Sequence, residues 1–189
     1  MLPVIIGIQV ITHFQPGFFR WFAAHAQLDW DTLNTLHVHR LVLSPLIQSE
    51  PGLVGTVLWL VIVLVPALEF RAGSRRTAAV FFVGDWISTI GSLLALRLAV
   101  SLGSMEATLL LARPDSGSSS GAFACASALG FSLPGKWRFL AAGILWSFVA
   151  YRIGFHHRYS DFQHGLAAFA GIVLAPKVPP KAALDAVTV

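Results

Sequence analysis

Two polar side chains in this apolar sequence could together carry out covalent chemistry. Ser119 follows Gly117-Ser118 at the start of a segment rich in small residues, and His164 lies near the start of the last apolar segment. A serine hydroxyl becomes a good nucleophile when a base takes its proton, and histidine, with an ordinary pKa of about 6.5, is the usual base. We therefore interpret Ser119 as a candidate nucleophile and His164 as its candidate general base, with Ser120 as the alternative nucleophile.

The composition predicts that these residues lie in an integral membrane protein. Of the 189 residues, 56% are hydrophobic and 12% are charged, and the mean hydropathy is +0.71. A membrane-spanning helix needs about 20 apolar residues, so the chain has room for several. The net charge of +4 comes from scattered Lys and Arg residues, as expected at helix ends, and a nucleic-acid-binding surface is not predicted.

Apolar segments separated by turn-forming or charged residues predict an all-α membrane protein with six transmembrane helices. We expect one domain over residues 1–177, with an amphipathic first loop at 23–52 and a flexible tail at 178–189. The first apolar segment is interrupted at Pro16-Gly17, which predicts a kink or a short helix. The expected helices cover residues 2–22, 53–70, 78–100, 115–133, 137–153 and 161–175.

The positively charged turns predict the orientation of this bundle. An even number of helices places both termini on one side, together with the arginine-rich turn 71–76 and the basic turn 136–138. The positive-inside rule makes that side cytoplasmic. Ser119 and His164 would then enter the membrane from the opposite, outer side and lie at similar depth.

Small residues four apart predict how the helices bearing the two residues pack. Such spacing lets helix backbones approach closely. It occurs in the fourth expected helix and again in the sixth. The pairs are Gly117/Gly121, Ala122/Ala126 and Ala167/Gly171.

Three acidic residues are candidate orienting or intramembrane acids. Asp85 lies inside an apolar segment and must pair, face the bundle interior or stay protonated, with structural and functional roles equally open. Asp161 precedes His164 by three residues and could orient its ring, although a helix N-cap is the favoured interpretation. Asp115 is expected to cap the helix that carries Ser119.

No cofactor or metal is predicted. The pairs His37/His39 and His156/His157 lack further ligands at a fixed spacing. The single cysteine, Cys125, lies within an apolar run of small residues and is expected to serve packing.

The chain resembles the rhomboid superfamily of intramembrane serine proteases, most closely the divergent rhomboid-like proteins of high-GC bacteria. The resemblance covers most of the chain and lies in the six expected helices, the long first loop and several short motifs. The motifs are Arg40-Leu41-Val42-Leu43-Ser44-Pro45, Leu68-Glu69 with Gly73, Asp115-x-Gly117-x-Ser119-x-Gly121, and His164 followed by small residues at plus three and plus seven. It implies that Ser119 is the nucleophile and His164 the general base.

The sequence also departs from this family. Typical members carry a His and an Asn at the start of the second helix that help to hold the oxyanion, and residues 51–63 contain neither. Backbone N–H groups near Gly117, Ser118 and Ser120 could supply the donors instead, because the first amides of a helix have no internal acceptor. Ala167 also stands where a glycine is usual.

The expected function is cleavage of a transmembrane segment of another membrane protein by a Ser-His dyad, within the lipid bilayer. The alternative is a catalytically inactive rhomboid-like protein that binds transmembrane helices or serves as an accessory subunit of a membrane complex. The expected partners in both cases are a transmembrane helix and the lipid bilayer of a bacterial inner membrane. No nucleic-acid partner is expected.

Overall fold

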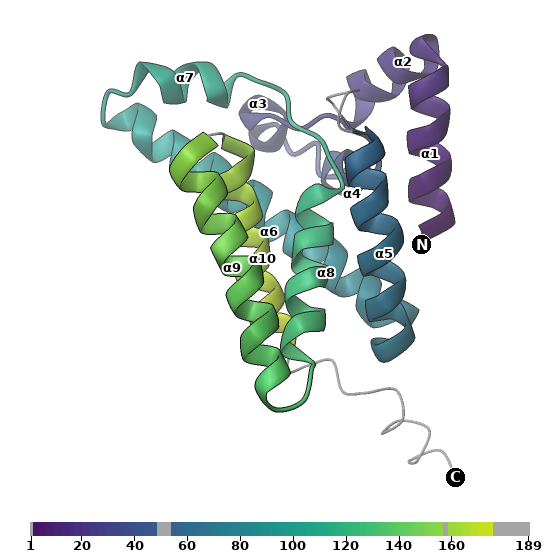
Figure 1. Cartoon of the computed structure of the whole chain (residues 1–189). Coiled ribbons are helices and arrows are strands. Elements are labelled where there is room, and N and C mark those ends of the chain that lie inside the picture. The colour runs from purple at the N-terminus through teal and green to yellow at the C-terminus, as the bar shows by residue number, and fades with distance from the viewer. Residues whose placement is uncertain (1, 49–53, 157–158, 176–189) are drawn as a thin grey trace.

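A computed structural model describes residues 2–48, 54–156 and 159–175, and the regular elements within these ranges are all helices, which confirms the all-α prediction (Figure 1). The expected tail at 178–189 lies outside the described residues. The elements are α1 (Leu2–Phe14), α2 (Pro16–Ala26), α3 (Trp30–Asn34), α4 (His39–Leu43), the 3-10 helix η1 (Ser44–Leu46), α5 (Val54–Ala72), α6 (Ser74–Ser101), α7 (Met105–Leu111), α8 (Ser119–Phe131), α9 (Lys136–His156) and α10 (Tyr159–Leu174).

Helix α8 is the centre of the bundle and packs against α5, α6, α9 and α10. Its small residues make this possible, because a Cβ atom on Gly84 of α6 or on Gly171 of α10 would overlap Ala124 of α8. Ala124 and Ala128 are both completely buried. Small residues therefore allow two helices, α6 and α10, to pack closely against α8.

The segment at 2–22, for which the sequence predicts one span with a kink or a short helix at Pro16-Gly17, forms two separate helices. Helix α1 ends at Phe14, and α2 begins at Pro16 after Gln15, whose backbone is not helical. Proline is well suited to the first position of a helix because its missing N–H would have no acceptor there. Helix α2 then continues to Ala26, into the region expected to be loop.

The expected loop at 23–52 contains further short helices. Asp29 caps α3, where its carboxylate accepts from the Thr32 N–H at 2.8 Å and the Thr32 hydroxyl accepts from the Asp29 N–H at 2.9 Å. This reciprocal pair is a capping box. Residues 49–53, which include the Pro51-Gly52 pair, lie outside the described part of the chain.

Several helix boundaries differ from the expected ones. Helix α6 begins at Ser74, directly after Gly73, so the three arginines near this turn lie on helices and the turn itself is one glycine with φ of 81°. Residues 105–111 form α7, whose N-terminus is capped by the Ser104 hydroxyl. Helix α8 begins at Ser119, later than the expected 115.

The bundle is apolar on much of its outside and carries polar groups inside. Side chains such as Trp59, Leu98, Phe139, Ile144 and Phe169 are more than half exposed. The buried polar residues include Gln9, Thr77, Asp85, Ser88, Ser92, Ser118, Ser127, Asp161 and Gln163. Within the described residues, the segments Ser74–Ser101 and Lys136–Phe155 are long and apolar enough to cross a membrane.

Candidate active site

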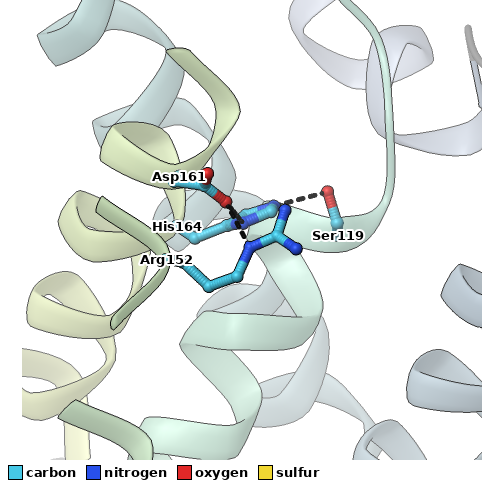
Figure 2. A network of polar contacts seen from close by, with 4 residues as sticks. All are labelled: Ser119, Arg152, Asp161 and His164. Carbon is cyan, nitrogen blue, oxygen red and sulfur yellow. Dashed lines mark hydrogen bonds and ion pairs between the residues drawn. The ribbon is translucent and has the colours of Figure 1, made fainter. Parts of the chain in front are cut away.

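Ser119 and His164 lie within hydrogen-bonding distance of each other. Ser119 is the first residue of α8, His164 lies in the second turn of α10, and both helices begin at the same end of the bundle (Figure 1). Ser119 Oγ is 3.0 Å from His164 Nε2 (Figure 2). That separation permits direct proton transfer from the hydroxyl to the ring. Both residues are partly exposed, so a ligand can approach them.

The segment before Ser119 is fixed by backbone hydrogen bonds to the first part of the chain. Leu28 and Asp115 exchange two N–H to carbonyl bonds, of 3.0 and 2.8 Å. The Gly117 N–H donates to the Ser44 carbonyl at 3.2 Å. Residues 115–117 thus have little freedom, and the position of the serine at the head of α8 is well determined.

The ring of His164 is held by an aromatic neighbour on α8. Phe123, one turn after Ser119, stacks on the imidazole with ring centroids 4.3 Å apart and planes 10° apart. Stacked rings resist rotation of either side chain out of the common plane. Phe123 therefore keeps Nε2 directed at the serine.

Asp161 lies on the other side of the ring and is paired with Arg152 of α9 (Figure 2). Its Oδ1 accepts from Arg152 Nε at 2.9 Å and lies 4.0 Å from His164 Nδ1. The second distance is too long for a direct hydrogen bond but short enough for attraction between the carboxylate and a protonated ring. The Asp161 side chain has no exposed surface, whereas that of Arg152 is 31% exposed.

These contacts correct the favoured interpretation of Asp161 as a helix N-cap. Helix α10 begins at Tyr159, so Asp161 lies inside its first turn. The carboxylate bonds to a side chain of the preceding helix instead of to the start of its own. The competing idea, that Asp161 orients the ring, fits its position within one helical turn of His164, although its role in catalysis stays a prediction.

Asp115 is not the cap of α8 either. The N-cap position belongs to Ser118, and Asp115 Oδ2 accepts from Gln163 Nε2 at 2.6 Å. Gln163 and Tyr159 also reach Ser92 of α6, at 3.3 and 2.7 Å. Asp115 therefore joins a polar cluster between α6 and α10 that lies next to the Ser119 segment.

Asp85 is placed in the interior by α6, where it is 3% exposed. It faces the bundle, which is one of the three outcomes expected for an acid within an apolar segment. Both the structural and the functional interpretation of Asp85 stay open.

The residues proposed to support an oxyanion differ in their availability. The first hydrogen bond of α8 runs from the Ala122 N–H to the Ser118 carbonyl, so the N–H groups of Ser119 and Ser120 precede the helical ladder. The Ser118 side chain does not cap them. Gly117 is a less suitable donor than expected, because its N–H is already bonded to Ser44.

Ser120, the alternative nucleophile, is 6% exposed and lies on a different side of α8. The histidine ring forms its contact with Ser119. The two side chains differ by about 100° around the helix axis, so one histidine cannot serve both.

Of the small-residue pairs, one member packs as expected and another meets a different neighbour. A Cβ atom on Gly171 would lie 2.8 Å from Ser127 Cβ, so α10 approaches α8 at Ala124 and Ser127. Gly121 instead lies against the Phe81 ring of α6. Ala122 and Ala167 are completely buried, while Ala126 is only partly buried. The close packing of α10 on α8 at Gly171 was predicted, but the face of α8 that receives it was not.

Sequence reasoning missed several residues around the site. The sequence did not predict a role at the site for Arg152, Phe123, Gln163 or Tyr159. Gln9 and Gln163 could have been identified from the sequence, because each is an amide side chain in an apolar segment. Among the described residues, no group of three or more His, Cys, Asp or Glu side chains is arranged to hold a metal ion.

Comparison with protein-family models, with curated proteins and with solved structures finds no match for this chain. The function of the protein is therefore inferred from the geometry of the site.

Proposed function

We propose that this chain is a six-helix, rhomboid-like membrane protein that hydrolyses a peptide bond within a transmembrane segment of another protein. The observation that carries the proposal is the 3.0 Å contact between Ser119 Oγ and His164 Nε2, at the end of the bundle where α8 and α10 both begin (Figure 2). A nucleophile in contact with a base that is itself oriented is the common signature of serine hydrolases.

The distribution of polarity supports the placement in a membrane. Large apolar side chains cover the outer faces of α1, α5, α6, α9 and α10, and polar side chains are collected inside. Helix α9 shows this most clearly, since only 6% of its most apolar 18-residue stretch is buried. In water such a surface would favour aggregation, whereas lipid tails cover it without loss.

In the proposed reaction, Ser119 Oγ attacks the carbonyl carbon of the substrate while His164 Nε2 takes the hydroxyl proton. The N–H groups of Ser119 and Ser120 at the head of α8 stabilise the negative oxygen of the tetrahedral intermediate. His164 then gives the proton to the leaving amine as the C–N bond breaks. Water attacks the acyl-enzyme in a second, equivalent cycle and releases the carboxylic acid and the free serine.

In the proposed reaction a positive charge develops on the His164 ring, and this charge gives Asp161 a role. When His164 holds the extra proton, Asp161 lies 4.0 Å from Nδ1 and favours the imidazolium. Phe123 keeps the ring in the plane that serves Ser119. Both side chains act by positioning and electrostatics.

A fluorophosphonate probe tests the dyad, since it reacts with activated serines. We expect the purified protein to be labelled, Ser119→Ala to abolish labelling and Ser120→Ala to retain it. His164→Asn should slow labelling by about 10² or more, because it removes the general base. Unchanged labelling in Ser119→Ala excludes Ser119 as the nucleophile.

A fluorogenic transmembrane peptide in proteoliposomes then tests proteolysis. Labelling together with cleavage supports the protease. The absence of both in a folded protein favours the inactive rhomboid-like protein that binds transmembrane helices or acts as an accessory subunit. One observation favours that alternative, namely that α5 carries no His or Asn to act as an oxyanion donor.

A further inference from the structure

Two glutamine side chains are buried beside the residues that precede Ser119. Gln9 of α1 is 0% exposed and donates from Nε2 to Ser118 Oγ at 2.6 Å. Gln48, which follows η1, is 8% exposed. The amide oxygen of each is buried and has no hydrogen-bond partner among the described residues. An unpaired buried acceptor costs about 1–3 kcal/mol, so two of them next to a candidate nucleophile indicate a ligand that donates hydrogen bonds.

Gly117 is shaped to receive the carboxamide of Gln48. A Cβ atom at this position would lie 2.8 Å from Gln48 Oε1 and 3.6 Å from its Cδ. Only glycine lets the carboxamide oxygen approach the backbone this closely two residues before Ser119. The Gly117 N–H cannot satisfy the oxygen, because it donates to the Ser44 carbonyl.

The head of α8 therefore combines donors with acceptors. The N–H groups of Ser119 and Ser120 precede the helical ladder, and the oxygens of Gln9 and Gln48 lie beside Ser118 and Gly117. An extended peptide presents both a carbonyl oxygen and an N–H at each residue. An ester of the same shape lacks the N–H at the scissile bond.

We propose that Gln48 Oε1 accepts a hydrogen bond from a backbone N–H of the bound substrate, so that the site selects an extended peptide. Gln9, which is completely buried, anchors Ser118 through its hydrogen bond to Oγ. The inference rests on the proposed function, because that function places the substrate carbonyl at Ser119. It adds a residue that determines specificity and that belongs to neither the dyad nor the positioning groups around it.

Binding of a labelled peptide tests this inference without any requirement for catalysis. The probe is a fluorescein-labelled Leu-Ala-Leu-Ala-Gly-Gly-Leu-Ala-Leu peptide, with analogues that carry a single N-methyl group at each backbone nitrogen in turn. Affinities are measured by fluorescence anisotropy in detergent, in the full chain with Ser119→Ala to prevent cleavage. One N-methyl position should weaken binding about 3- to 10-fold, the loss of one hydrogen bond.

Gln48→Met should weaken binding of the unmethylated peptide by the same factor and remove the sensitivity to that N-methyl group. The matched control is Gln15→Met, at an exposed glutamine between α1 and α2. Gly117→Ala is a second variant, since its methyl group displaces Gln48 Oε1 while the glutamine is retained. It should reproduce the effect of Gln48→Met even where that variant folds poorly.

The possible results separate this inference from the proposed function. Equal binding of every N-methyl analogue, or no binding of the probe to the chain with Gln48, overturns the inference whatever the fluorophosphonate labelling shows. Absence of labelling together with a Gln48-dependent preference for the N–H overturns the proposed hydrolase activity and leaves a peptide-binding site.

Discussion

Phe123 stacks on His164 with ring planes 10° apart, and the two residues come from the two helices that would have to cooperate in catalysis. The imidazole thus has an aromatic ring on one face, Ser119 at Nε2 and Asp161 on the Nδ1 side. Each neighbour restricts a different motion of the ring. Removal of one of them should therefore affect reactivity more than stability.

Phe123→Leu should slow fluorophosphonate labelling of Ser119 about 3- to 10-fold. The reason is that an aromatic pair contributes about 0.5–1.5 kcal/mol beyond its buried area, and this energy fixes the reactive rotamer. The measurement is the labelling rate in detergent. Phe169→Leu on α10 is the control, because Phe169 is 57% exposed. Equal rates in both variants would contradict a role for the stacking.

Arg152→Met should lower the free energy of unfolding of the protein by about 2 kcal/mol. It leaves the fully buried Asp161 carboxylate without its partner on α9, and an unpaired buried charge is expensive. Thermal unfolding in detergent measures the effect, with Arg138→Met as the control at an exposed arginine of the same helix.

The double variant Arg152→Met with Asp161→Asn should recover most of the lost stability, because it removes both charges together. Recovery of stability without recovery of labelling would show that the Asp161 carboxylate also supports the His164 ring in its reaction with Ser119. A double variant as unstable as Arg152→Met alone would mean that the ion pair does not explain the loss.

The contact between Ser119 and His164 could be anticipated because it depends on topology. Two apolar segments that enter the bundle from the same end, each with its polar residue near that end, bring those residues to the same level. The small residues of α8 also predicted that its neighbours come close. To predict these features, only the order and direction of the helices must be known.

The partners of the acids could not be anticipated in this way. The N-cap interpretation of Asp161 and Asp115 considers only neighbours in the chain, whereas their bonds are made to Arg152, nine residues away, and to Gln163, 48 residues away. Such contacts depend on the rotation of each helix about its axis. The side chains of α8 are mostly small, and apolar residues lie on every side of this helix. Its sequence therefore does not specify how the helix is rotated.

Gly171→Ala should destabilise the bundle by about 1–3 kcal/mol, since the added methyl group would overlap the backbone of Ala124. The loss is expected in thermal unfolding, and α8 and α10 should separate enough to slow labelling of Ser119 as well. Gly143→Ala on α9 is the matched control, because nothing lies within 4 Å of a Cβ atom there. A control as unstable as Gly171→Ala would remove close packing as the cause.

Cysteines introduced at the two ends of the bundle test its proposed orientation in the membrane. Met105 at the head of α7 is 75% exposed, and Pro134 lies in the exposed turn between α8 and α9. Because α8 runs between these two levels, a spanning bundle places them on opposite sides. The native Cys125 is buried and should give little background.

We expect a membrane-impermeant maleimide to label Met105→Cys in intact cells and Pro134→Cys only after permeabilisation. The physical reason is that the basic residues Arg71, Arg75, Lys136 and Arg138 lie near the Pro134 end, which the positive-inside rule keeps cytoplasmic. The opposite pattern would invert the orientation and move Ser119 to the cytoplasmic side. Labelling of both cysteines in intact cells would contradict a bundle in which α8 crosses the membrane.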